Sequence, residues 1–93
     1  MVLVMNDDQV NNREAYLPLA KAFVEDAKKD KGCIDMNIYV DPEDEGRVVY
    51  VSHWESKEDF LAHMQGPAFA KHIPGMGQYF ISAKDTILSQ VTE

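Results

Sequence analysis

The stretch VVYVSHWESKEDFLAHMQGPAF, residues 48–69, decides the fold of this chain. Its first four residues, Val48–Val51, are apolar and predict a buried strand. Ser56 then stands where a helix N-cap is expected, with Asp59 three residues later as in a capping box. Gly66-Pro67 ends that helix and can start a second, short one. The stretch therefore predicts a strand followed by a helical region that is broken in two.

Before this stretch the sequence predicts two strands and one helix. Residues 1–5 form an apolar run typical of a buried strand, and the polar residues 6–8 are expected to end it. Apolar residues then recur at helical spacing between Tyr16 and Ala27. Asn11 or Asn12 is expected to cap the helix, with Pro18 near its first turn and Gly32 at its end. Residues 33–41 alternate between apolar and polar side chains, which is the period of a strand.

The loops and the last strand complete the expected architecture. Residues 41–46, DPEDEG, predict a hairpin loop, and Pro74–Gly77 is expected to be another loop. A last strand is expected between Phe80 and Val91. Its most apolar residues are expected to be buried: Ile87, Leu88 and Val91. The element order is βαββαβ, which predicts an α+β fold with a four-stranded sheet.

Length, composition and charge describe one acidic globular domain over residues 1–93. The chain is 45% hydrophobic and 27% charged, and its length suffices for a single core. Its net charge of −7 and the lack of a Lys/Arg stripe argue against nucleic-acid binding. Cys33 is the single cysteine, and no signal peptide or long apolar segment is evident. We therefore expect no membrane partner and a cytoplasmic location.

Both faces of the expected sheet need cover. The first strand and Val48–Val51 are apolar on both faces, whereas two helical regions can cover only one face of a four-stranded sheet. A chain of this length would leave a large apolar face in water. We therefore expect a homodimer in which two sheets pack face to face around a barrel-like core.

His63 is the most interesting polar side chain of the helical region. It shares a helical face with Phe60 and Met64, so it is expected to point inward. A buried imidazole tends to stay neutral, which leaves one nitrogen free to accept a proton. His63 is thus either a general base or orienting group for a phenolic ligand, or a hydrogen-bonded core histidine.

Trp54 lies at the end of its strand, on the side of Tyr50 and Ser52. It is either a core aromatic that pins helix to sheet or a pocket wall whose N–H points at a ligand. His53 is expected on the opposite side of the sheet, and His72 on the surface. The histidines lack metal-ligand spacing, and no Gly-rich nucleotide fingerprint is present, so we expect neither a metal nor a cofactor site.

Several of these motifs together resemble the antibiotic biosynthesis monooxygenase (ABM) family. They are Gly32-Cys33, Asp41-Pro42, WESKEDF at 54–60, His63, and Pro-Ala-Phe at 67–69. The resemblance implies a ferredoxin-like fold and a dimeric α/β barrel. Some members are cofactor-independent monooxygenases, in which a deprotonated quinol or anthrone passes an electron directly to O₂.

The resemblance also implies a set of site residues. By position, the catalytic candidates are Trp54, His63 and Asn6, although Asn6 is equally a strand-ending turn residue. The candidate substrate-binding residues are Tyr50, Phe60, Met64 and Phe69. Haem-degrading relatives carry a Trp where this chain has His63, and their ligand position lies one residue beyond His72. Haem degradation is therefore disfavoured.

Three functions fit these observations. The first is a small monooxygenase that oxidises a quinol, anthrone or related phenolic compound with O₂ and without a cofactor. The second is a non-catalytic ligand-binding or stress-response barrel that uses the same pocket. The third is an isomerase of a signalling-sugar derivative, since one branch of the family processes a quorum-sensing sugar. Turnover separates the enzymes from the binding protein.

Overall fold

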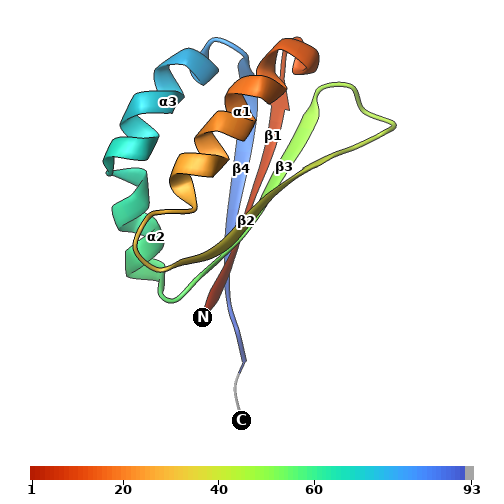
Figure 1. Ribbon diagram of the computed structural model, residues 1–93. Helices are drawn as coiled ribbons and strands as arrows, with labels where there is room; N and C mark the ends of the chain where they lie inside the picture. Colours follow the sequence, from red (N-terminus) through yellow and green to blue (C-terminus); the bar gives the residue numbers. More distant parts are fainter. Residues whose placement is uncertain (92–93) are drawn as a thin grey trace.

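The computed structural model describes residues 1–91 as a four-stranded antiparallel sheet with helices on one face (Figure 1). The elements in chain order are β1 Val2–Val10, α1 Arg13–Ala27, β2 Cys33–Val40, β3 Arg47–Trp54, α2 Lys57–Met64, α3 Pro67–Gly77 and β4 Phe80–Ser89. The strands lie side by side in the order β2-β3-β1-β4. The predicted α+β, ferredoxin-like βαββαβ arrangement is confirmed.

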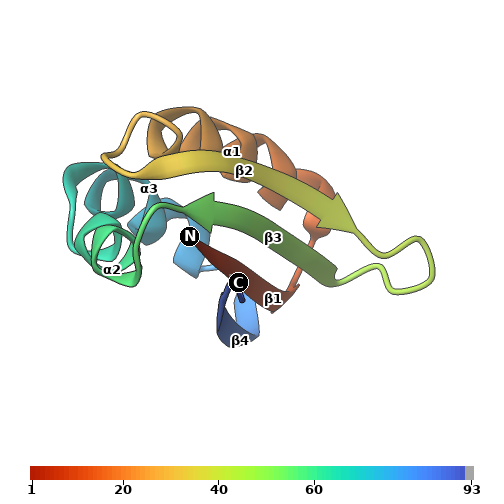
Figure 2. The ribbon, with the colours of Figure 1, turned by 90° about the horizontal axis from the view of Figure 1, so that it is seen from below.

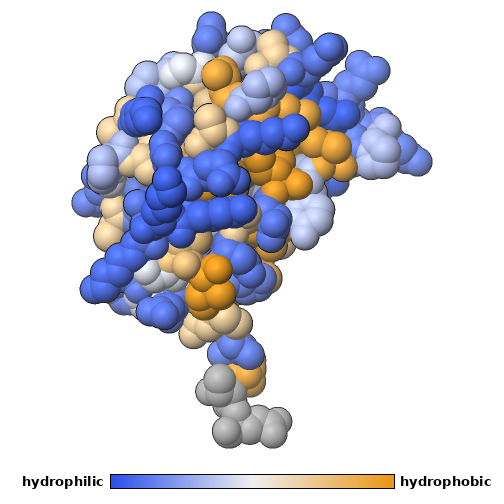
Figure 3. Space-filling model, viewed as in Figure 1, coloured by the Kyte–Doolittle hydropathy of each residue, from blue (hydrophilic) through white to orange (hydrophobic). Residues whose placement is uncertain are grey.

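The helices and the strands form two layers. Figure 2 shows α1, α2 and α3 on one side of the twisted sheet, while the other side carries no helix. Residues of β3 alternate accordingly: the even-numbered ones, Val48 to Trp54, are buried under the helices, and the odd-numbered ones are half-buried on the bare face. The surface on the helix side is mainly hydrophilic, with an apolar area beside α1 over β2 (Figure 3).

Strand β1 extends to Val10, so the prediction that residues 6–8 end it is wrong. Its backbone pairs on both sides, with β3 as far as Gln9 and with β4 as far as Val10. This double ladder outweighs the poor strand propensity of Asn and Asp. Asp7, on the bare face, is neutralised by Arg47, whose Nη2 lies 2.8 Å from Asp7 Oδ2. Asn6 and Asp8 consequently lie on the helix-side face.

The ends of α1 were predicted in part. Asn12 is the N-cap, because its side chain accepts a hydrogen bond from the Ala15 amide. Pro18 lies inside the helix rather than in its first turn, and Gly32 lies beyond the helix end at Ala27, so both of these expectations are wrong. Gly32 instead has φ +84 and lies against α2, where an added Cβ would be 2.2 Å from Asp59 Oδ2.

Two C-terminal expectations are also wrong. Pro74–Gly77 is not a loop but the last part of α3, which continues because Ile73 and fully buried Met76 anchor it to the core. Leu88 and Val91 are 52% and 89% exposed, because Leu88 lies opposite Leu3 on the bare face and Val91 follows β4. The predicted helix start at Ser56 is confirmed, since its Oγ accepts from the Asp59 amide.

Candidate functional site

A cavity of about 170 Å³ lies between the sheet and the helices. Its walls are mainly aromatic and other apolar side chains: Phe23, Phe60, Met64, Phe69, Ile73 and Phe80. Five polar residues also line it: Asn6, Asp8, Tyr50, His63 and Asp85. An apolar pocket with a few convergent polar groups is the usual form of a small-molecule site.

Six of the seven site residues proposed from the sequence line this cavity: Asn6, Tyr50, Phe60, His63, Met64 and Phe69. Trp54 does not. It is fully buried, and its indole N–H donates to Ser52 Oγ at 2.9 Å rather than to the cavity. Its ring centre lies 4.9 Å from that of His63, so Trp54 supports the imidazole from behind.

His63 is held in place by a carboxylate. Its Nδ1 lies 2.6 Å from Oδ2 of Asp30, in the loop after α1. This contact is largely shielded from water on the histidine side, because the His63 side chain is only 3% exposed. A neutral imidazole that donates from Nδ1 leaves Nε2 as an acceptor. Within residues 1–91 every fully buried side-chain nitrogen or oxygen has a hydrogen-bond partner. Nε2 of His63 makes no hydrogen bond, so it is not fully buried and is open to the cavity.

Asp8 is a second polar group at the cavity, and sequence reasoning missed it. It is 4% exposed, and among the described residues its carboxylate makes no hydrogen bond or ion pair. Burial raises the pKa of Asp8 to about 7, and the charges of Asp85 and Asp7 act in the same direction. The sequence predicts that Asp8 ends the first strand, although this residue falls in the period-2 series of Val2, Val4 and Val10.

Tyr50 and Tyr16 form a buried pair beside Asp8. Their hydroxyl groups share a short hydrogen bond that joins β3 to α1. Tyr16 is fully buried and does not line the cavity, whereas Tyr50 does. Burial raises the pKa of Tyr16 to about 12 and raises that of Tyr50 as well, so both hydroxyls keep their protons.

Asn6 lies at the more exposed side of the cavity. Its Nδ2 donates to Asp85 Oδ1 at 2.8 Å, which links β1 to the edge strand β4. Asn6 is opposite Tyr50 in the register of β1 and β3, so its side chain stands next to the tyrosine pair on the same face. The amide oxygen of Asn6 remains available to a ligand.

The other two histidines lie outside the cavity. His53 is on the bare face, as predicted, where Nδ1 lies 2.7 Å from Asp35 Oδ1. His72 was expected on the surface, but its side chain is only 15% exposed and Nε2 lies 2.6 Å from Asp26 Oδ2. Across residues 1–91 no group of three or more His, Cys, Asp or Glu side chains is placed to hold a metal ion. In the same range no helix is long and apolar enough to cross a bilayer.

Comparison with known proteins gives a family and a fold. The family model described as antibiotic biosynthesis monooxygenase matches residues 1–75. No curated protein matches the chain. A crystal structure of an antibiotic biosynthesis monooxygenase superposes with a TM-score of 0.88 at 20% identity, covering 99% of this chain and 100% of the other.

Two further solved structures agree with this. A conserved protein of Methanosarcina mazei has a TM-score of 0.86 at 19% identity, with 97% of this chain and 92% of the other covered. SnoaB, a cofactor-independent oxygenase of Streptomyces nogalater, has a TM-score of 0.87 at 11% identity, with 99% and 94% covered. At these identities the likeness establishes the fold.

Proposed function

The chain belongs to the antibiotic biosynthesis monooxygenase family, and we propose that it is a small monooxygenase that oxidises a phenolic compound, a quinol in particular, with O₂ and without a cofactor. The observation that carries this proposal is the aromatic cavity into which His63 presents an unpaired nitrogen. A ring hydroxyl that donates to Nε2 would be fixed in orientation, because Asp30 and Trp54 hold the imidazole from two sides.

The size of the cavity favours a single aromatic ring. A cavity of about 150 Å³ accommodates benzene, and this one measures about 170 Å³. A three-ring anthrone is larger than this volume and would extend beyond the cavity. As the substrate, we therefore favour a one-ring quinol over an anthrone.

The proposed chemistry needs no external reductant. Net conversion of a quinol and O₂ to a hydroxyquinone and water balances: one oxygen atom enters the ring and the other leaves as water. All four electrons that reduce O₂ come from the substrate. The task left to the protein is to bind the ring, remove the phenolic proton and keep the resulting electron-rich anion away from water.

Oxygen uptake with a panel of hydroquinones and anthrones tests this function. The expected result is uptake above the spontaneous rate for one-ring quinols, and a lower rate with His63→Ala. His72→Gln is the matched control, since His72 has a similar aspartate contact but does not line the cavity. Binding without uptake for every compound would contradict the proposal and favour the non-catalytic ligand-binding function.

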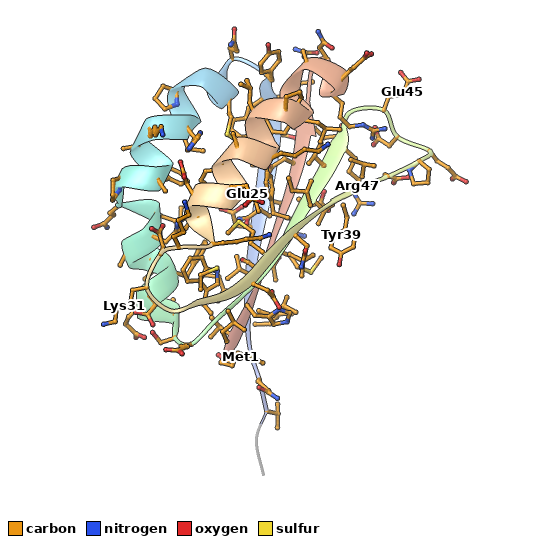
Figure 4. The ribbon with its side chains drawn as sticks, in the orientation of Figure 1. Met1, Glu25, Lys31, Tyr39, Glu45 and Arg47 are labelled. Carbon is orange, nitrogen blue, oxygen red and sulfur yellow. The ribbon has the colours of Figure 1, made fainter. Side chains whose placement is uncertain are left out.

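A homodimer is part of the proposal. The bare face of the sheet carries a central apolar strip made by alternate residues of the strands: Leu3, Met5, Tyr39, Val49, Val51 and Leu88. Tyr39 and Arg47, on β2 and β3, flank the β2–β3 loop beside it (Figure 4). Packing this strip against a second copy would bury it without closing the cavity on the other face.

A further inference from the structure

We propose that Asp8 accepts the phenolic proton of the substrate while the hydroxyl of Tyr50 donates to the oxygen that becomes charged, and that the site thereby selects a ring without an acidic substituent. The inference rests on the proposed function and deepens it, because it assigns the proton acceptor and the class of substrate. His63 then has the role of orienting the ring.

The placement of Asp8 supports its role as acceptor. The residue is 4% exposed, and its carboxylate has no partner among residues 1–91. Every fully buried side-chain oxygen in that range has a hydrogen-bond partner. The carboxylate of Asp8 has none, so it is not fully buried and is open to the cavity that it lines. A buried, unpaired carboxylate is costly, and a ligand hydroxyl would supply the missing hydrogen bond.

Burial favours one direction of the tyrosine hydrogen bond. Tyr16 is fully buried, and Tyr50 is its only hydrogen-bond partner among the described residues. If Tyr50 donated to Tyr16, the hydroxyl hydrogen of Tyr16 would be buried without an acceptor. In the proposed arrangement Tyr16 donates to Tyr50, which leaves the hydrogen of Tyr50 free. Because Tyr50 lines the cavity, that hydrogen is available to a ligand oxygen.

The two groups make the proton transfer feasible. A phenol ionises near pH 10 and an ordinary aspartate near pH 4, so transfer between them is about a millionfold unfavourable. Raising the pKa of Asp8 from 3.8 to about 7 recovers about a thousandfold of this. A hydrogen bond from Tyr50 to the phenolate oxygen recovers more. The O–H bond of the phenol breaks, Asp8 becomes neutral, and its negative charge moves to the substrate oxygen.

The charges around Asp8 set the class of substrate. Asp85 on β4 and Asp7 on β1 both act on it, while Tyr50 on β3 and Tyr16 on α1 contribute neutral hydroxyls. His63 is the other titratable group at the cavity. A ligand with its own carboxylate would add a negative charge beside Asp8 and Asp85, and like charges repel strongly in an apolar setting. A neutral hydroquinone avoids this repulsion.

Anaerobic binding measurements test the inference separately from turnover. Calorimetric titration compares methylhydroquinone with 2,5-dihydroxybenzoate, a ring of similar size that carries a carboxylate. At pH 8 we expect the wild type to prefer the neutral compound by at least about tenfold. The preference should shrink below about pH 6, where Asp8 is protonated and the ligand carboxylate is still ionised. Asp8→Asn should show a much smaller preference at pH 8 and little change between the two pH values, since only Asp85 remains.

Asp7→Asn is the matched control, because Asp7 is the neighbouring carboxylate on the opposite face and pairs with Arg47. It should keep the preference. Equal binding of both compounds by the wild type at pH 8, or a full preference in Asp8→Asn, would overturn the assignment of Asp8 even if the protein is an oxygenase. Conversely, the expected binding pattern without oxygen uptake would support Asp8 and contradict only the proposed activity.

The donor role of Tyr50 has its own measurement. 4-Nitrophenol changes colour when it ionises, so absorbance reports the ratio of anion to neutral phenol in the bound state. Tyr50→Phe should lower this ratio by about tenfold or more, the effect of a lost hydrogen bond to a charged group. Tyr16→Phe should lower it less, since the hydroxyl of Tyr50 remains. An unchanged ratio in Tyr50→Phe would refute the donor role.

Discussion

His63 and Asp30 are joined by a 2.6 Å contact between Nδ1 and Oδ2, which ties α2 to the loop that follows α1. The contact fixes both the position of the imidazole and the nitrogen that faces the cavity. His63 therefore depends on a residue 33 positions away for its function.

Substitution of this pair should weaken ligand binding. His63→Ala removes the hydrogen bond to the ring hydroxyl, and we expect roughly a tenfold loss of affinity for methylhydroquinone. Asp30→Asn should cause a smaller loss, because the amide can still accept from Nδ1 but no longer enforces that tautomer. Titration calorimetry measures both. Wild-type affinity in His63→Ala would exclude the orienting role.

Stability should depend on pH through Asp8. The folded protein keeps the Asp8 proton up to about pH 7, whereas the unfolded chain releases it near pH 3.8, so stability falls as pH rises through this window. The cost at pH 8 is on the order of 3–4 kcal/mol at most. Asp8→Asn should therefore be more stable than wild type at pH 8, with little difference at pH 4. Urea unfolding at the two pH values checks this, and an equal gain at both would contradict it.

Gly32 should tolerate no side chain. Gly32→Ala places a Cβ against Asp59 and demands a positive φ, so we expect a loss of roughly 1–3 kcal/mol. Gly75→Ala is the contrasting variant, because Gly75 lies inside α3 with open space around it. It should stabilise the protein by about 0.5–1 kcal/mol. Urea unfolding of the two variants should move in opposite directions, and an unchanged or higher stability in Gly32→Ala would contradict the cost assigned to Gly32.

Association should be lost when the bare face is charged. Val51→Lys places an ammonium in the middle of the apolar strip, opposite Met5, and we expect a monomer by light scattering where the wild type is a dimer. Leu61→Lys, at a 42% exposed position on α2, should leave the dimer intact. A monomeric wild type would contradict the homodimer itself.

The sequence predicted those features of the fold that local signals determine. The apolar run Val48–Val51 and the cap at Ser56 are carried by neighbouring residues, and the strand and the helix start that they predict were both found. The extent of β1 was missed, because Asp7 and Asp8 stay in a strand only through pairing with β3 and β4. Pairing of this kind is not reflected in the strand propensity of the residues themselves.

The site was predicted to a similar degree. His63 could be placed on the inner helical face from its spacing to Phe60, and both line the cavity. The hydrogen-bond partners of His63 and Tyr50 could not be predicted, because Asp30 and Tyr16 lie 33 and 34 positions away from them along the chain. Trp54 shows that the position of a residue in the chain does not by itself predict its role. It lies at the end of β3 as expected, but its N–H donates to Ser52 and is not available to a ligand.

The alternation of β3 has a consequence for how this protein can change over evolutionary time. Even-numbered positions such as Tyr50 belong to the cavity layer, and odd-numbered positions such as Val51 belong to the opposite face. Selection for a new ligand and selection for a new partner therefore act on interleaved but separate positions of one strand. Point mutations can explore either property alone. A single inserted residue would exchange the two sets, so this segment should accept substitutions far more readily than insertions.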